Sequence, residues 1–251
     1  MKYSVSLIVP VRDEEGTISE LVTRVPLLGK HTEIIFVEGF SKDGSWEVIK
    51  KISSEVGHIK SNNQKLHIRA YKQRGKMGKG RAVEIGFDNA KGDILIILDA
   101  DLSVPPESLR GFYQLLASRR ADFVNGSRFI YPKEKGAMRY FNHLGNRFFA
   151  FIFSIILGQR ITDTLCGTKA LFRKDWLPIL EVTRRIRKDD PYGDFTLLLG
   201  AAKLGLRVAE VPIKYKARVY GKSKISPFWD GIKLFVLLAK DIRDYFISIF
   251  S

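Results

Sequence analysis

Short β-branched runs alternate with helical patterns along the first 130 residues of the chain. Strict alternation of strands and helices is typical of right-handed βαβ units, which build a mostly parallel sheet. The run at 93–98, Asp-Ile-Leu-Ile-Ile-Leu, is apolar without alternation, as in a central strand covered on both faces. The sequence therefore predicts an α/β fold, Rossmann-like, with a mostly parallel sheet flanked by helices. The expected strands are Ser4–Val9, Glu33–Val37, Leu66–Ala70, Asp93–Leu98 and Ala121–Asn125, and the expected helices are Gly16–Leu28, Ser45–Val56, Met77–Asn89 and Pro105–Ser118.

The alternation ends near residue 130, and the second part of the chain has a different pattern. A helix is expected over Arg139–Leu157, basic and aromatic at its start and almost entirely apolar at its end. Another helix is expected over Asp194–Leu204, followed by a strand over Arg207–Ile213. Because no linker and no internal repeat separates these parts, we expect one domain over residues 1–225 and an amphipathic helical segment over residues 226–251.

Positive charge is concentrated in the second part of the chain. The 251 residues include 42 Lys and Arg against 27 Asp and Glu, which gives a net charge of +15. Residues 1–100 hold 16 basic and 13 acidic side chains and the remainder holds 26 and 14, so the net charges are +3 and +12. This split indicates an anionic partner: nucleic acid, anionic lipid or a phosphorylated substrate. The single cysteine, Cys166, excludes an internal disulfide and a multi-cysteine zinc site, and we interpret it as a packing residue of a cytoplasmic protein.

No stretch has the roughly 18 uninterrupted apolar residues of a membrane-spanning helix. The first apolar run, Val5–Val11, is short and leads directly into charged residues, so no secretory signal is expected. Two later stretches, 148–157 and 232–250, are apolar and aromatic but too short or interrupted by charges. We interpret them either as helices lying on a membrane surface or as two core helices.

Asp99-Ala100-Asp101 follows the central apolar strand directly. In open parallel sheets ligands bind at the carboxyl ends of the strands, so both carboxylates are expected where a site would form. Two aspartates on a sharp turn can hold a hard divalent cation that also bridges substrate phosphates. The alternative is a solvated turn or a helix N-cap, where Asp is also favoured.

Two further strand ends carry acidic residues, at Pro10 to Glu15 and at Glu38 to Ser45. Three such ends on one edge of the sheet favour a single polar crevice, in which carboxylates accept hydrogen bonds from a nucleobase or from ribose hydroxyls. For each group alone, turn and capping chemistry is the better explanation.

The loop Gln73 to Arg81 is glycine-rich and basic, and it leads into a helix, as an anion cradle does. It lacks the Walker pattern, and no G-x-G-x-x-G follows the first strand, which counts against a dinucleotide enzyme. The alternative is a mobile solvated loop. Arginines and lysines that suit phosphate follow later in the chain, at Arg128, Arg139, Arg147, Arg218, Lys222 and Lys224.

Taken together and in this order, the motifs resemble family 2 glycosyltransferases of the GT-A fold, particularly dolichol-phosphate mannose synthases and related polyprenyl-phosphate sugar transferases. The resemblance covers about residues 4–225. The family's usual Asp-Asp-Gly-Ser turn is Glu38-Gly39-Phe40-Ser41 here, which leaves the nucleobase, and hence the sugar, open. The matching motifs are Ile8-Val9-Pro10, Glu38 with Ser41-x-Asp43-Gly44, Gly78-Lys79-Gly80, Asp99-Ala100-Asp101, Gly126-Ser127-Arg128, Asp163-Thr164 with Gly167, and Glu210-Val211-Pro212-Ile213 with Arg218 and Gly221-x-Ser223-Lys224.

The resemblance implies roles for these residues. Asp99 and Asp101 would hold Mg²⁺ or Mn²⁺ against the diphosphate of a nucleotide-sugar donor. Asp194 would orient the acceptor or act as a weak base, as a fifth catalytic residue beside Asp99, Asp101, Arg128 and Arg218. The donor pocket would comprise Pro10, Arg12, Glu14, Glu38, Lys79, Asp99 and Lys224, and the phosphates would meet Arg128, Arg139, Arg218 and Lys224.

The implied activity is transfer of a hexose, of mannose or glucose type, from GDP-mannose or a UDP-hexose to polyprenyl or dolichyl phosphate. One displacement with inversion is expected, on the cytoplasmic face of a membrane and with or without an anchoring subunit. One alternative is a family 2 enzyme with a non-lipid acceptor, and another is a non-catalytic scaffold. A basic nucleic-acid-binding domain would explain the charge and the 12% aromatic content but not the aspartate pair, so nucleic acid is not the expected partner.

Overall fold

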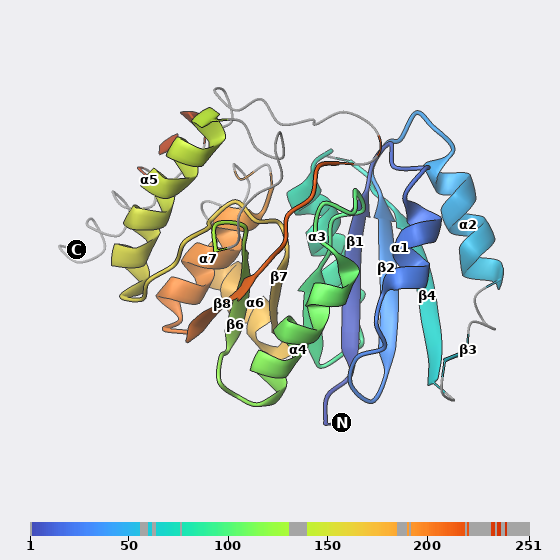
Figure 1. The fold of residues 1–251 in the computed structure, drawn as a ribbon, viewed down its shortest axis with the longest axis horizontal. Helices are drawn as coiled ribbons and strands as arrows, with labels where there is room; N and C mark the ends of the chain where they lie inside the picture. The colour runs from blue at the N-terminus through green and yellow to red at the C-terminus, as the bar shows by residue number, and fades with distance from the viewer. Residues whose placement is uncertain are drawn as a thin grey trace.

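The computed structural model describes residues 2–55, 60–61, 64–75, 77–130, 140–184, 190, 192–218 and 220, together with 232, 233, 235, 236 and 239. Its strands form one sheet in the order β3-β4-β2-β1-β5-β7-β6-β8 (Figure 1). The pairs β2–β4, β1–β2, β1–β5 and β6–β8 are parallel, which confirms the predicted mostly parallel α/β sheet. The strands are β1 (Val5–Val11), β2 (Thr32–Glu38), β3 (Lys60–Ser61), β4 (Gln64–Lys72), β5 (Ile94–Ile97), β6 (Phe123–Ser127), β7 (Lys169–Phe172) and β8 (Val208–Pro212).

Helices cover both faces of this sheet, so the molecule has three layers. One core contains apolar residues of α1, α2 and α4, and the other contains those of α3, α5, α6 and α7. Neighbouring strand residues enter opposite cores, as Leu7 and Ile8 do, which explains why these strands are apolar without alternation. The helices are α1 (Ile18–Arg24), α2 (Ser45–Glu55), α3 (Lys79–Asp88), the 3-10 turn η2 (Pro106–Ser108), α4 (Leu109–Ala117), α5 (Tyr140–Leu157), α6 (Arg173–Val182) and α7 (Asp194–Lys203).

Strand β7 was not among the expected elements. It lies between β5 and β6 and is antiparallel to both, so it runs in the opposite direction to its two neighbours. Only four residues long and beginning with Lys169, it has neither the length nor the alternation that identified the other strands. Helix α6, which follows it without a gap, was also not expected.

Backbone strain gathers at the carboxyl ends of three strands. Within the described ranges, the non-glycine residues with positive φ are Asp13, Phe40, Leu102 and Arg119. Asp13 follows β1, Phe40 follows β2 and Leu102 follows β5. These strands are neighbours in the sheet, so three of the four strained residues lie on one edge. Residues with strained backbone cluster at functional sites, and this edge is where the sequence predicts one.

Candidate active site at the carboxyl edge of the sheet

The two aspartates after β5 are each paired with a cation. Lys79, the first residue of α3, places its Nζ 2.6 Å from Oδ1 of Asp99. Arg218 places Nη2 2.8 Å from Oδ2 of Asp101, and its Nη1 donates to the carboxylate of Glu14. Strand ends β1 and β5, a helix start and the segment after β8 thus meet in one charged cluster. The structure brings five of the predicted site residues together.

These charges shift one another's titration. Burial alone would raise the pKa of Asp99, but Lys79, Arg218 and Lys169 together hold it below its ordinary value. Burial would lower the pKa of Lys79, but Asp99, Asp194 and Asp101 raise it. At neutral pH Asp99 is therefore ionised and Lys79 is protonated.

The turn after β5 fixes the direction of Asp101. Oδ1 of Asp101 accepts hydrogen bonds from the backbone N–H of Ser103, at 3.0 Å, and from its hydroxyl, at 2.7 Å. Leu102, with φ of 58°, is buried between them. Oδ2 is left for a partner, and Arg218 occupies that side. The aspartate is therefore pre-oriented by its own turn.

Arg218 reaches the site because the segment after β8 returns across the molecule (Figure 1). The N–H of Lys216 donates to the carbonyl oxygen of Ser103 at 2.9 Å. The ring of Tyr220 lies so close to Gly16 that a Cβ there would approach it to 2.6 Å. The segment thus lies over the ends of β1 and β5, far from its own strand.

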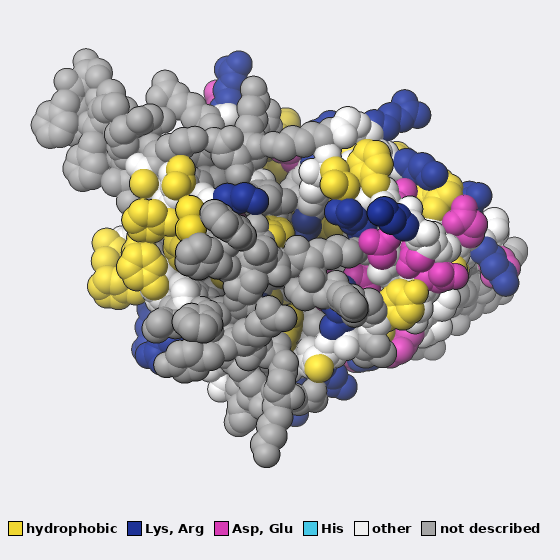
Figure 2. All heavy atoms as spheres, turned by 90° about the horizontal axis from the view of Figure 1, so that it is seen from above, with side chains coloured by type: hydrophobic (Ala, Val, Ile, Leu, Met, Phe, Trp, Pro, Cys, Tyr) yellow, Lys and Arg dark blue, Asp and Glu magenta, His cyan; other side chains and the backbone are white. Residues whose placement is uncertain are grey.

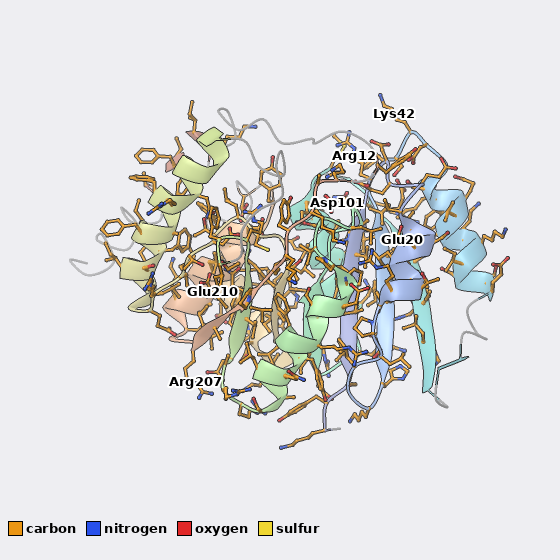
Figure 3. The ribbon with its side chains drawn as sticks, viewed as in Figure 1. Arg12, Glu20, Lys42, Asp101, Arg207 and Glu210 are labelled. Atoms are coloured by element: carbon orange, nitrogen blue, oxygen red, sulfur yellow. The ribbon has the colours of Figure 1, made fainter. Side chains whose placement is uncertain are left out.

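The loops after β1 and β2 are bound to each other. The N–H of Asp13 donates to Oγ of Ser41 at 3.0 Å, and the N–H of Lys42 donates to Oδ1 of Asp13 at 2.6 Å. Glu38, the last residue of β2, is buried and accepts the N–H of Ser41. Arg12 and Lys42 lie along the same edge as Asp101 in Figure 3. Pro10, in β1, pairs with Val37 of β2, so the predicted pocket residues occupy adjoining strand ends.

Asp194 begins α7 and is held by a buried lysine. Nζ of Lys169 lies 2.9 Å from Oδ1 of Asp194 and also donates to the carbonyl oxygen of Cys166. Lys169 has no exposed surface, so its charge is balanced inside the protein. Asp194 also contributes to the raised pKa of Lys79, which links it to the aspartate pair.

Arg128 lies in a different environment from the one expected. Its Nε and Nη2 donate to the two oxygens of Asp163 at 2.7 and 2.8 Å, and its guanidinium faces the ring of Tyr215. Asp163 is fully buried, and only 12% of the Arg128 side chain is exposed. The structure therefore gives Arg128 an internal carboxylate partner, which the sequence did not indicate.

Glu210 has a similar internal function. Its carboxylate accepts the N–H of Thr162 and of Asp163. Figure 3 shows it well away from Asp101. The motif residues Asp163 and Glu210 therefore shape the turn that leads to Gly167.

Gly167 allows that turn to lie against the site. A Cβ at this position would collide with Nζ of Lys79 and with the carboxylate of Asp99. Cys166 beside it is buried, and burial, with Asp163, raises the pKa of its thiol to about 12, so it is a packing residue as expected. The sequence motifs identified Gly167 and Asp163 but not the contacts that they make. They gave no function to Lys169.

Other predicted residues lie outside the described part of the chain, namely Arg139, Lys222 and Lys224. Within the described ranges no three His, Cys, Asp or Glu side chains form a metal cage. Asp99 and Asp101 are the carboxylates at the strand end, and they can supply one or two ligands of a hard cation whose remaining ligands come from phosphate and water.

The family of the chain follows from comparison with known proteins. Residues 6–178 match the model of glycosyl transferase family 2. A dolichol-phosphate mannosyltransferase of Pyrococcus furiosus is 28% identical over 88% of this chain, which spans 59% of that protein. A UDP-N-acetylglucosamine–dolichyl-phosphate N-acetylglucosaminyltransferase of Methanococcus voltae is 28% identical over 92% of this chain and 93% of its own length.

A third relative is the undecaprenyl-phosphate 4-deoxy-4-formamido-L-arabinose transferase of Edwardsiella ictaluri, 26% identical over 88% of this chain and 62% of its own length. Among solved structures, glucosyl-3-phosphoglycerate synthase of Mycobacterium tuberculosis, crystallised with Mn²⁺ and UDP, has a TM-score of 0.67 at 18% identity. That likeness covers 95% of this chain and 80% of the other, and it shows the GT-A fold. On its sequence and its fold, the chain belongs to glycosyl transferase family 2.

Proposed function

We propose that the protein transfers a hexose from a nucleotide-sugar to a polyprenyl phosphate while resting on a membrane surface. The observation that carries this proposal is the pair Asp99 and Asp101 at the end of β5, with Lys79 and Arg218 against it. The relatives named above support the acceptor class, because their names place sugars on dolichyl or undecaprenyl phosphate.

The aspartate pair fits a divalent cation of the Mg²⁺ or Mn²⁺ type. Both offer carboxylate oxygens, which these ions prefer, and Asp101 is already oriented by Ser103. In the structure Lys79 and Arg218 balance the negative charge of the same carboxylates. When bound, such an ion stabilises the negative charge that develops on the leaving diphosphate.

The chain's own cations act on the same phosphates. Lys79 and Arg218 already lie at the carboxylates, so a small movement of either side chain brings it to a phosphate oxygen. The guanidinium of Arg218 can bind two oxygens at once, which fixes the donor's orientation. Glu14 holds Arg218 from the other side and so limits its movement.

The acceptor phosphate is anionic near neutral pH, so it needs positioning more than deprotonation. Asp194, at the start of α7 and close to Lys79, is the residue we assign to orienting it or accepting a proton. We expect one in-line displacement at the anomeric carbon, with inversion and without a covalent intermediate.

Helix α5 presents an apolar face outside the core. Phe148, Phe151 and Ile155 are 49%, 67% and 67% exposed, whereas Phe149 and Phe153 of the same helix are buried. Figure 2 shows hydrophobic side chains gathered at this end of the molecule. Phe235, from the C-terminal segment, contacts Phe148 at 6.5 Å between ring centroids and is also exposed. Within the described residues no helix is long and apolar enough to cross a bilayer.

A variant in which Phe151 and Ile155 are both replaced by Glu is expected to lose binding to anionic phospholipid vesicles. Each apolar side chain that no longer enters the lipid lowers the partition coefficient of the protein between water and vesicle about tenfold. The new negative charges add to this loss. Co-sedimentation with vesicles measures it. Leu177→Glu, at a 70% exposed position of α6, is the matched control and is expected to bind normally. Equal vesicle binding by the double variant and the wild type would contradict a lipid contact on α5.

The function is tested by transfer of radiolabelled sugar into organic-extractable lipid. Purified protein is mixed with polyprenyl phosphate, Mn²⁺ or Mg²⁺, and GDP-mannose, UDP-glucose or UDP-N-acetylglucosamine in turn. Metal-dependent label in the lipid phase is the expected result, and it identifies the donor. Metal-dependent hydrolysis without lipid label would assign the enzyme another acceptor. No turnover and no binding of any donor would reject the proposal.

A further inference from the structure

The exposed phenylalanine at the end of β2 is unusual in two ways. Phe40 has a φ of 62°, in the left-handed region that non-glycine residues rarely adopt, and its side chain is 45% exposed. Positive φ costs a bulky residue free energy, and a phenylalanine left 45% exposed gains only part of the free energy of burial. Both properties favour glycine at this position, so a benefit outside the folding of this loop is needed to explain phenylalanine.

The other three residues with positive φ have contacts that offset the strain. Leu102 is buried in the core. Arg119 lies over the ring of Phe172 at 4.2 Å and donates to the hydroxyl of Tyr3. Asp13 accepts the N–H of Lys42. Within the described part of the chain, the ring of Phe40 makes no such ring or cation contact.

The backbone around Phe40 is held rigidly. The N–H of Gly39 donates to the carbonyl oxygen of Val11 at 2.8 Å. The N–H of Ser41 donates to Glu38, and the hydroxyl of Ser41 accepts the N–H of Asp13. Hydrogen bonds on both sides of Phe40 therefore fix its backbone, so a ligand that meets the ring has only the side-chain torsions of Phe40 to order.

The position of Phe40 follows from the strand order. Strand β1 lies between β5 and β2, so the ends of β5 and β2 are about 10 Å apart at ordinary strand spacing. On the proposed function, the donor's diphosphate lies at Asp99 and Asp101, after β5. A nucleotide that extends from there across β1 brings its base to the end of β2, where Phe40 is.

We infer that Phe40 stacks on the nucleobase of the donor, an inference that rests on the proposed function. A base offers a flat face to an aromatic ring, and such stacking tolerates any base. Phe40 lies on a loop whose backbone is held by hydrogen bonds. Beside it is Glu38, whose carboxylate is buried at the same strand end. Phe40 is therefore a binding residue that strengthens donor affinity through the base, not through the phosphates.

The test compares ligands with and without a base. UDP, GDP and inorganic pyrophosphate, each with Mn²⁺, are titrated calorimetrically into the wild type, Phe40→Ala, Phe40→Gly and Phe40→Trp. Loss of the ring is expected to weaken UDP and GDP about tenfold, with pyrophosphate unchanged, and Phe40→Trp is expected to restore the affinity. Phe40→Gly, which relieves the strained φ, is expected to unfold at a higher urea concentration than Phe40→Ala yet bind nucleotides equally weakly.

Leu177→Ala removes an exposed apolar side chain from α6 and is expected to leave all three affinities unchanged. Undiminished UDP and GDP binding by Phe40→Ala would overturn the stacking inference and leave the proposed function standing. Equal weakening of pyrophosphate would also overturn it, since the ring would then be acting on the site as a whole. A wild type that binds pyrophosphate but neither nucleotide would overturn the proposed donor and the inference together.

Discussion

Replacing Asp101 with Asn is expected to lower sugar transfer by at least about a hundredfold, because one charged ligand beside the leaving diphosphate is lost. Asp99→Asn is expected to act similarly, since its carboxylate faces the same site from two residues away. The measurement is single-turnover transfer from the donor found in the lipid assay, with Mn²⁺ varied. The apparent Mn²⁺ affinity is expected to fall together with the rate.

The control for this result lies at the other end of the same strand. Asp93 precedes β5, and it accepts hydrogen bonds from the backbone and side chain of Ser4. Asp93→Asn changes the same residue type at that end and is expected to leave transfer and its metal dependence within about twofold, as surface substitutions usually do. Because Asp101 also holds the turn at Ser103, urea unfolding of each variant separates loss of ligand from loss of fold. Full metal-dependent transfer by both Asp99→Asn and Asp101→Asn would contradict the assignment.

The parallel half of the fold could be predicted because its signal is local. Strands β1, β2 and β5 are buried on both faces, and each contains a short apolar run, at 7–11, 34–37 and 94–97, before a polar turn. Once such strands are parallel, their carboxyl ends share an edge, so Asp99 and Asp101 could be placed there from sequence. Cys166 could be assigned to packing for a similar reason, since nothing near it in sequence would activate a thiol.

The rest of the site depends on contacts between distant parts of the chain. Arg218 is 204 residues from Glu14, and no local pattern indicates that it returns to this carboxylate. The lysine of β7 looks like a surface residue in sequence, yet Lys169 is fully buried on Asp194. Arg128 was expected at a phosphate because arginine suits phosphate, but its neighbour across the turn, Asp163, satisfies the same geometry from inside the protein. Residue chemistry predicts what an arginine can bind, whereas packing decides which partner is present.

The pair of Arg128 and Asp163 leads to the largest expected effect on stability. Asp163→Ala leaves a buried guanidinium without its counter-charge and removes the acceptor of two backbone N–H groups, those of Arg128 and Leu165. Breaking a buried pair in this way costs about 3–5 kcal/mol, a large part of the stability of an ordinary domain. Urea unfolding measures the loss.

The exposed pair of Arg207 and Asp122 is a matched control. Its Nε and Nη2 donate to the two carboxylate oxygens at 2.7 and 3.0 Å, nearly as in the buried pair, but 59% of the Arg207 side chain is exposed. Asp122→Ala is therefore expected to cost no more than about 1 kcal/mol. The two substitutions remove the same kind of ion pair, which is buried at Asp163 and exposed at Asp122, and Asp163→Ala also leaves one more backbone N–H without its acceptor. Equal losses from the two variants would show that the internal pair is not electrostatically buried.

The same pair sets a pH dependence whose direction can be worked out. Burial alone would raise the pKa of Asp163, but Arg128 and Lys169 hold it below its ordinary value in the folded state. In the unfolded chain Asp163 titrates near pH 4, so its contribution is fully present above that pH. It is lost as the pH falls through the lowered pKa of the folded protein.

The wild type is therefore expected to lose stability on acidification below about pH 4 more steeply than Asp163→Ala, which has already lost this group. If the free energy of unfolding depended on pH in the same way for both proteins, Asp163 would not be the origin of the acid sensitivity.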